Sequence, residues 1–453
     1  MTSAPGKPPI PVMPGGLPGI GHLPRFARDP LSFFTALRER GDIVRWRLGN
    51  MDSVFVAHPD DIQSVFLNVE KTFSMDVDSG YAFTLFAGQG IINTHGEFWR
   101  RQRKMMQPGM HPRRIAGYAD TMVTLTEQML QGWRPGETRD IRVEMLALTQ
   151  RIAAKTLFGA DVSGDAATVG DALDVASREI GAEFRGVTMF IPPSVPTPGR
   201  RRLKAAIGQV EQVLYRIIAE RKAATGDRPD DMLSMLIDAR DDDGQPMSDK
   251  QLRDETMTLY IAGHETTGNT LVWAYQLLAR NPHVYERMIQ EITEVVGNRP
   301  PEMSDYVALR YTEAVVKETL RLYPPAWLFQ VKAAADVTLG GHAIARDTNV
   351  WMSQWATHRD PRWFDTPDAF RPERFLGDNL ATMPTYAWFP FGGGPHVCLG
   401  NRFALVEAVL ILATIAQRYR LDLDPDLVIT PQPLLTLQPG RDVPMRLHRP
   451  TAA

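Results

Sequence analysis

Apolar residues recur at three- and four-residue spacing through the middle of the chain, which is the periodicity of amphipathic helices. Between Gly, Pro and Asn residues, this pattern predicts helices near 114–133, 139–158, 198–224, 248–280, 282–296 and 308–322. The apolar and polar alternation that is typical of strands is confined to Asp42–Arg47, Ser53–Ala57, Asp336–Trp351 and the C-terminal tail. The patterning therefore predicts a mainly α fold with small β-sheets.

The longest predicted helix occupies residues 248–281. It begins at Ser248, where Ser-Asp-Lys-Gln is a capping-box pattern, and continues without proline as far as Asn281-Pro282. A helix of about 33 residues is roughly 50 Å long, which is enough to cross a whole domain. By contrast, six prolines within the first 18 residues predict an extended, proline-rich N-terminal arm over 1–25.

Composition and charge narrow the class of protein. The 453 residues are 43% hydrophobic and 23% charged, which is typical of a globular protein with a large core. Lys and Arg total 50 against 53 Asp and Glu, so no overall basic field favours nucleic acid or an anionic membrane. The longest apolar stretch, Val406–Ala416, is far shorter than the roughly 20 residues that cross a bilayer. We expect a soluble, cytoplasmic protein with no membrane span and no nucleic acid partner.

Cys398 is the only cysteine of the chain, which excludes an internal disulfide, a multi-cysteine zinc site and a cysteine-ligated iron–sulfur cluster. It lies in the segment Phe391-Gly-Gly-Gly-Pro-His-Val-Cys-Leu-Gly400, just before a helical pattern. The glycines suit a loop whose backbone approaches a flat ligand closely. A helix N-terminus stabilises a thiolate, which is a nucleophile or a metal ligand. The alternative is a small buried hydrophobe, the usual role of a lone cysteine.

This segment resembles the haem-binding loop of the cytochrome P-450 family, Phe-x-x-Gly-x-[Arg/His]-x-Cys-x-Gly. The matching positions are Phe391, Gly394, His396, Cys398 and Gly400. The resemblance implies that Cys398 is the proximal thiolate ligand of the iron of haem b. It extends over essentially the whole chain and implies the cytochrome P-450 fold in a single domain, 1–453. The haem-thiolate loop and its following helix would occupy 389–418, and the helix at 248–281 would carry the oxygen groove.

Ala262-Gly-His-Glu-Thr-Thr267, in the middle of the long helix, is a second motif of the family. Glycine and paired threonines are poor choices for a helix interior, and a Thr hydroxyl can bond to a preceding carbonyl and bend the helix. A tolerated polar bend is one interpretation. The resemblance implies another, in which Thr266 bonds the bound dioxygen, Glu265 relays protons from solvent, and Gly263 leaves room for the diatomic ligand.

Two further motifs bring charged and aromatic side chains toward the same loop. Glu318 and Arg321 lie three apart on one helical face, an arrangement that contributes little when it is exposed. The resemblance implies that they join Arg374, in Pro-Glu-Arg-Phe, in a buried structural network beneath the haem loop. Trp99 and Arg103 share a helix face as the family's Trp-x-x-x-Arg. The haem contacts that the resemblance implies are His95, Trp99, Arg103, Ala262, Phe391, Gly392, His396 and Gly400.

The same resemblance implies an apolar substrate pocket, although core packing is the usual role of each such residue. Its predicted lining is Phe83, Phe86, Ala262, Ala326, Leu328 and Leu435. We expect hydroxylation or epoxidation of a lipophilic molecule, such as a fatty acid, terpenoid or carotenoid, with O2 as co-substrate. The chain after Gly400 carries no flavin or nicotinamide fingerprint, so electrons are expected from a separate ferredoxin or flavodoxin with its reductase. A monomer is expected, with a donor-docking face formed by Arg100, Arg101, Lys104, Arg113, Arg114 and Arg402.

Other interpretations stay open from the residues. They are a peroxide-dependent or isomerising haem-thiolate enzyme, a non-catalytic haem sensor or lipophile carrier, and a hydrolase with Cys398 as nucleophile. The intact pair Glu265-Thr266 favours the monooxygenase, because the other activities have no evident use for a proton relay.

Overall fold

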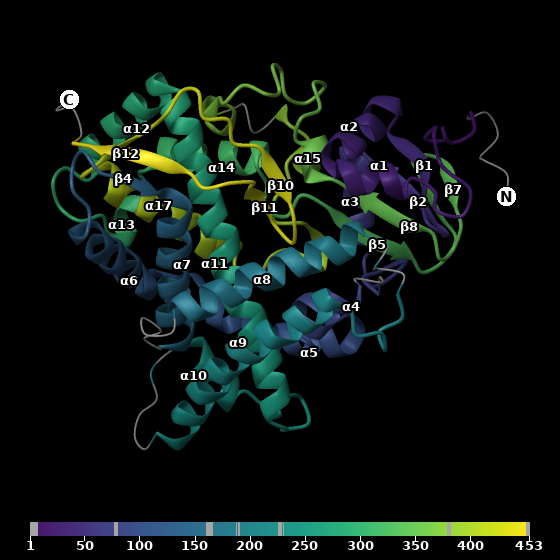
Figure 1. Ribbon diagram of the computed structural model, residues 1–453, viewed down its shortest axis with the longest axis horizontal. Helices are drawn as coiled ribbons and strands as arrows, with labels where there is room; N and C mark the ends of the chain where they lie inside the picture. The colour runs from purple at the N-terminus through teal and green to yellow at the C-terminus, as the bar shows by residue number, and fades with distance from the viewer. Residues whose placement is uncertain are drawn as a thin grey trace.

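The computed structural model describes residues 8–76, 80–159, 166–186, 188, 191–224, 229, 231–377 and 382–449. Long helices occupy the left and centre of the molecule as drawn in Figure 1, and the largest β-sheet lies at the right, where α2 packs on β1 and β2. The predicted fold class, mainly α with small sheets, is confirmed.

The helices are α1 (Leu23–Arg28), α2 (Pro30–Arg40), α3 (Pro59–Leu67), α4 (Tyr81–Ala87), α5 (Gly96–Met106), α6 (Pro112–Gln131), α7 (Ile141–Phe158), α8 (Ala166–Arg185), α9 (Pro198–Ala223), α10 (Met232–Asp238), α11 (Asp249–Arg280), α12 (Pro282–Val295), α13 (Met303–Tyr306), α14 (Arg310–Leu322), α15 (Gln354–Thr357) and α17 (Asn401–Ala416). Short 3-10 turns are η1 (Ile91–Asn93), η2 (Gln107–Met110), η4 (Pro372–Phe375), η5 (Thr385–Ala387) and η6 (Gly394–His396). The strands are β1 (Ile43–Leu48), β2 (Met51–Val56), β3 (Phe73–Ser74), β4 (Thr138–Asp140), β5 (Phe329–Ala333), β6 (Val337–Leu339), β7 (His342–Ile344), β8 (Asn349–Met352), β9 (Arg420–Leu423), β10 (Pro431–Pro433), β11 (Leu437–Pro439) and β12 (Pro444–His448).

The predicted long helix is α11, and its ends follow the expected signals. The Ser248 side chain accepts a hydrogen bond from the Gln251 N–H at 3.1 Å, and the helix ends at Asn281, before Pro282. Most residues of α11 are buried, because α7, α9, α14 and α17 pack around it. The helix crosses the middle of the molecule in Figure 1. α11 is therefore the element against which the other helices are positioned.

The largest sheet has the order β1-β2-β8-β5-β3, with β2 and β8 parallel and the other neighbours antiparallel. Alternate side chains point into two separate apolar clusters. Trp46, Phe55 and Trp351 join an aromatic cluster with α1 and α2, whereas Val54 and Val350 join a cluster that includes α3. Burial on both faces explains why the alternation of apolar and polar residues is weak along β2 and β8.

The smaller sheets are β4-β12-β9, β10-β11 and β6-β7. The N-terminal arm runs beside β1, where the Met13 N–H donates to the Arg45 carbonyl at 2.8 Å. The extended part ends before α1 begins at Leu23, earlier than the expected boundary at residue 25, and residues 1–7 lie outside the described chain. Within the described residues, no helix is both long enough and apolar enough to cross a membrane.

Candidate functional site

The loop before α17 holds Cys398 in an unusual environment. Its N–H donates to the Phe391 carbonyl at 2.9 Å, and its thiol accepts a hydrogen bond from the Gly400 N–H. The side chain is accessible, yet burial raises the pKa of the thiol, against smaller opposing effects of Gly400 and Arg103. A side chain that faces an enclosed space inside a protein is accessible to a small probe and is also far from bulk solvent, so it can combine accessibility with a pKa raised by burial.

The Gly400 N–H at the start of the following helix lowers the thiol pKa, as expected for a helix N-terminus, but burial raises the pKa by more. Burial disfavours the charged form more than the Gly400 N–H and Arg103 favour it. A bound cation would overcome this cost, because a metal ion deprotonates a coordinating thiol. In the described part of the chain, no group of three or more His, Cys, Asp or Glu side chains could hold a metal ion.

The three glycines of the loop serve packing within the protein. A Cβ at Gly394 would lie 2.1 Å from the Phe66 carbonyl oxygen of α3, and one at Gly393 would lie 2.3 Å from the Tyr386 ring. Gly394 also has φ +60°, a conformation that L side chains rarely adopt. These glycines therefore allow close approach to α3 and to Tyr386, and their close approach to a flat ligand stays a prediction.

The predicted Trp-x-x-x-Arg motif lies on α5, against the cysteine loop. The Trp99 and His396 rings stack with centroids 3.7 Å apart, and the Arg103 guanidinium lies 5.7 Å from the Trp99 ring centroid. Burial lowers the pKa of Arg103, and electrostatic attraction to Cys398 partly offsets the change. His95 is exposed and close enough to His396 to lower its pKa slightly. The structure thus gathers the predicted haem contacts of α5 around Cys398.

Glu70, which the sequence did not single out, ties α5 to the cysteine loop. Its Oε1 lies 3.0 Å from Nε2 of His396, and its Oε2 accepts the Gly96 N–H at 2.8 Å. Glu70 has φ +73°, a strained conformation for a residue other than glycine. Burial lowers the pKa of His396, and the bond to Glu70 opposes that effect. The imidazole is held by stacking on one face and by a carboxylate at one nitrogen.

The middle of α11 presents its accessible face at Ala262, although the residues before and after it in the helix are largely buried. The Thr266 hydroxyl donates to the Ala262 carbonyl at 2.7 Å, the backward bond expected of a helix-bending threonine. A Cβ at Gly263 would lie 3.5 Å from Leu157 of α7. A Cβ at Gly263 would therefore make ordinary contact with α7, and the role of Gly263 in leaving room for a diatomic ligand stays a prediction.

The Glu265 carboxylate points into a closed polar cluster, away from Thr266. Its Oε1 accepts hydrogen bonds from the Thr436 hydroxyl at 2.6 Å, the Gln438 amide at 2.6 Å and the Ser177 hydroxyl at 3.3 Å. These donors come from α8 and from the hairpin β10–β11 and its turn, and Glu265 is 6% exposed. The structure brings Glu265 and Thr266 onto one helix turn but turns them to different surroundings.

A second carboxyl group lies close to this turn of α11. Glu407 of α17 is fully buried and near Thr267, and burial raises its pKa well above the usual value. Burial therefore favours the uncharged form of the Glu407 carboxyl group. The sequence gives no signal for this proximity of Glu407 to Thr267, because Glu407 belongs to no motif.

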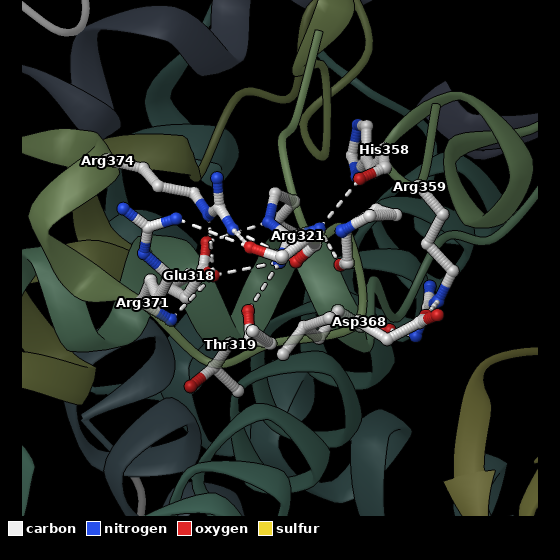
Figure 2. Close-up of polar contacts among 12 residues, drawn as sticks. Glu318, Thr319, Arg321, His358, Arg359, Asp368, Arg371 and Arg374 are labelled. Carbon is white, nitrogen blue, oxygen red and sulfur yellow. Dashed lines mark hydrogen bonds and ion pairs between the residues drawn. The ribbon is translucent and has the colours of Figure 1, made fainter. Parts of the chain in front are cut away.

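Figure 2 shows the predicted charged network, which the structure brings together. Arg321 donates to both carboxylate oxygens of Glu318, at 2.7 and 2.8 Å, and both side chains are fully buried. Arg374 lies 3.3 Å from Glu318, and the Arg371 N–H donates to the same carboxylate at 2.9 Å. A buried charge with this many partners is costly to disturb.

The network reaches the cysteine loop through His358. Arg321 donates to the His358 carbonyl at 2.8 Å, and the His358 Nε2 accepts the Phe389 N–H at 2.9 Å. Phe389 lies two residues before Phe391, whose carbonyl accepts the Cys398 N–H. The ion pair on α14 therefore helps to fix the backbone that presents the thiol.

The predicted pocket residues are divided between two apolar clusters. Phe83, Phe86 and Leu435 pack with the large cluster around α11, and Phe86 is 3% exposed. Leu328 packs against the aromatic cluster of the N-terminal part, and Ala326 is half-buried beside it in the chain. Their contact with substrate stays a prediction.

The predicted basic face is partly neutralised by acidic residues. Arg101 lies 3.5 Å from Asp241, Lys104 lies 2.6 Å from Asp242, and Arg100 lies 3.9 Å from Glu70. Arg113 and Arg402 are exposed, and Arg114 is half-buried.

Comparison with known proteins identifies related chains. The family model described as Cytochrome P450 matches residues 11–443. "Cyclooctatin synthase" of Streptomyces melanosporofaciens is 36% identical over 438 residues, which cover 96% of this chain and 94% of the relative. "Cyclooctat-9-en-7-ol 5-monooxygenase" of the same organism is 36% identical over 90% of this chain and 88% of its own. "Pentalenene oxygenase" of Streptomyces avermitilis is 31% identical, covering 96% of both chains.

Proposed function

The chain belongs to the cytochrome P-450 family and is a monooxygenase of lipophilic molecules, and we propose that it binds haem b through Cys398 and hydroxylates a cyclised terpenoid. The observation that carries the cofactor assignment is the lone thiol, accessible but desolvated, with the Gly400 N–H bonded to it. Arg103 interacts electrostatically with this thiol, and its guanidinium is a hydrogen-bond donor suited to carboxylate groups, while Trp99 stacks on His396 of the same loop.

Haem supplies the reductive activation of O2, so that one substrate C–H becomes C–OH and the second oxygen atom leaves as water with two electrons and two protons. The chain's residues hold the cofactor and move the protons. Cys398 would provide the anionic sulfur ligand, and the hydrogen bond from the Gly400 N–H would stabilise the negative charge on that sulfur. Arg103 and His396 would hold the carboxylate groups of the cofactor, His396 through a nitrogen that Glu70 leaves free or after exchange of its bond to Glu70.

Proton delivery is assigned to α11. The Thr266 hydroxyl, which donates to the Ala262 carbonyl at 2.7 Å, holds a proton at Oγ1 beside the accessible face of the helix. The Glu265 carboxylate receives a proton from solvent. It then leaves its present hydrogen bonds to Thr436, Gln438 and Ser177 and passes the proton to the Thr266 hydroxyl. The pair favours an O2-dependent reaction over a peroxide-dependent one, which needs no such relay.

The substrate class is assigned from the relatives together with the apolar pocket lining. Two of their names specify oxygenation of cyclooctat-9-en-7-ol and of pentalenene, which are cyclic terpenoids. Phe83, Phe86 and Leu435 offer hydrocarbon surface and no charge to such a skeleton. A cyclised terpenoid therefore fits better than a fatty acid, whose carboxylate would need a cationic partner.

A screen of the haem-loaded protein tests the substrate class. Cyclic terpene hydrocarbons and alcohols, with fatty acids as the comparison, are tested for the low-to-high-spin shift and then for turnover under ¹⁸O2. Turnover uses ferredoxin, its reductase and NADPH. We expect a shift and a singly ¹⁸O-labelled alcohol from a cyclic terpenoid. A shift and product from fatty acids alone would overturn the substrate assignment.

We also propose that electrons come from a separate ferredoxin or flavodoxin and that the protein works as a cytoplasmic monomer. The charges of α5 and its neighbourhood support an acidic donor, since Arg113 and Arg402 are exposed. We expect haem reduction to depend on an added donor protein. We also expect a monomeric mass in solution.

A further inference from the structure

Helix α5 is the surface element that lies against the cysteine loop. Its Trp99 stacks on His396, and its Arg103 interacts electrostatically with Cys398. A shallow hollow of about 550 Å³ opens over this helix, lined by Trp99, Arg100, Arg103, Gln107 and His111 among others. A donor protein that approaches Cys398 through α5 therefore meets this hollow and the charges beside it.

The chain's own acidic turn also lies beside α5, and Lys104 lines both the hollow over Trp99 and the hollow beside this turn. Asp242 is 2.6 Å from Lys104, and Asp241 is 3.5 Å from Arg101. A second hollow, of about 380 Å³, lies between α5, the end of α10 and this turn. α10 contacts α5 and leads toward the turn, in the lower part of Figure 1.

The turn has a defined conformation. The Asp241 carboxylate accepts the backbone N–H groups of Asp243 at 3.1 Å and Gln245 at 2.8 Å, and its carbonyl accepts the Gly244 N–H at 2.9 Å. These bonds keep Asp241 only 12% exposed, whereas Asp242 is 84% exposed beside Lys104. The acidic charge is therefore held in place against α5.

Stability does not account for this arrangement. Exposed ion pairs such as Lys104–Asp242 contribute little to folding. Charges at a docking surface nevertheless act on the association rate, because their field extends roughly 8–10 Å at physiological salt. The consequence of the turn is therefore expected in partner association.

We infer that the Asp241–Asp243 turn is a built-in competitor of the acidic electron donor. It neutralises Arg101 and Lys104 and leaves Arg103, beside Trp99, as the charge on this part of α5 that attracts an acidic iron–sulfur protein. The turn thus lowers the association rate and directs the donor toward the side of α5 that contacts the cysteine loop. This inference rests on the proposed function, because it requires an external donor.

The test uses the haem-loaded full chain and a plant-type [2Fe–2S] ferredoxin as the acidic probe. The second-order rate constant of haem reduction by this ferredoxin is measured under CO at increasing NaCl concentration. The double variant Asp241→Asn/Asp242→Asn is compared with the parent protein. We expect a roughly 3- to 10-fold faster reaction at about 20 mM ionic strength, falling below about twofold at 0.5 M. An unchanged or slower reaction at low salt, or a gain that salt does not reduce, would overturn the inference.

A matched control separates local charge from net charge. Asp424→Asn/Asp426→Asn removes two charges from a similar Asp turn at the other end of α11, where Arg280 donates to Leu427 at 2.6 Å. We expect it to leave the rate within about twofold. A gain equal to that of the first double variant would contradict a local role.

Two further measurements keep the result interpretable. Asp242→Asn alone changes an 84% exposed side chain, so its folding is secure, and it should give part of the gain. The dithionite-reduced CO spectrum of every variant tests the proposed function separately. A thiolate-type band together with unchanged ferredoxin kinetics would remove the inference and leave the proposed function intact.

Discussion

Replacement of Glu255 by Gln should make the protein relatively more stable as the pH rises. Glu255 of α11 is fully buried, and its carboxylate accepts the Ile91 N–H at 2.9 Å and the Gln251 amide at 2.7 Å. Burial raises the pKa of Glu255 to about 7, and the two hydrogen bonds only partly oppose this effect. The side chain holds the segment that follows α4, so its ionisation affects the predicted pocket wall.

The size of the effect follows from linkage. The unfolded chain releases this proton near the ordinary pKa of 4.5, whereas the folded chain keeps it up to about 7. The folded state therefore binds more protons between these values, and stability falls as the pH rises through this window. A pKa difference of about 2.5 corresponds to about 3 kcal/mol as an upper estimate. With an unfolding entropy of about 2.1 cal/mol/K per residue, this is roughly 3 °C in Tm for a chain of this length.

The assay is the Tm of the haem-loaded protein by calorimetry at pH 5 and pH 8. The Tm of Glu255→Gln minus that of the parent should rise by roughly 3 °C between pH 5 and pH 8, because the amide cannot ionise. Glu220→Gln, on the exposed face of α9, controls for the chemical change and should show the same Tm difference at both pH values. A difference for Glu255→Gln that does not change with pH, or that changes in the opposite direction, would refute the reasoning.

Three other substitutions test separate parts of the site. Glu318→Gln should lower stability by about 3–5 kcal/mol, measured as a lower Tm, because Arg321 keeps its charge in a buried network and loses its main partner. Glu407→Gln should change stability by less than about 1 kcal/mol, because burial already favours the uncharged form of the carboxyl group that the amide replaces, and a large loss of Tm would contradict this. Thr266→Ala should keep consuming NADPH while releasing peroxide in place of product, and an unchanged ratio of product to NADPH would count against its proton-holding role.

Local signals explain why much of the helical framework could be predicted. The Ser248 cap, the proline after Asn281 and the apolar periodicity act within a few residues, and α11 has the predicted limits. The helix α8 was not predicted, because Gly170 and Gly181 interrupt its pattern. A Cβ at Gly181 would lie 2.9 Å from the Leu434 side chain, so this glycine allows close packing against the C-terminal hairpin.

The partners of the predicted site residues depend on tertiary contacts that no local pattern records. The bond between Glu70 and His396 joins residues 326 apart, and the bond between Glu265 and Gln438 joins residues 173 apart. A single sequence identifies Glu265 and His396 by their motifs, because motif spacing is local. It does not identify Glu70 or Gln438, whose roles depend on how distant segments pack.

The reduced, carbon monoxide-bound absorption spectrum of the haem-loaded protein tests the central claim most directly. Cys398 is the only thiol of the chain, so a single substitution removes every possible sulfur ligand of this kind. We predict the red-shifted Soret band of a thiolate-ligated haem for the parent protein and its loss in Cys398→Ser. Absence of that band from the parent, or its retention in Cys398→Ser, would contradict the assignment of Cys398 as the iron ligand.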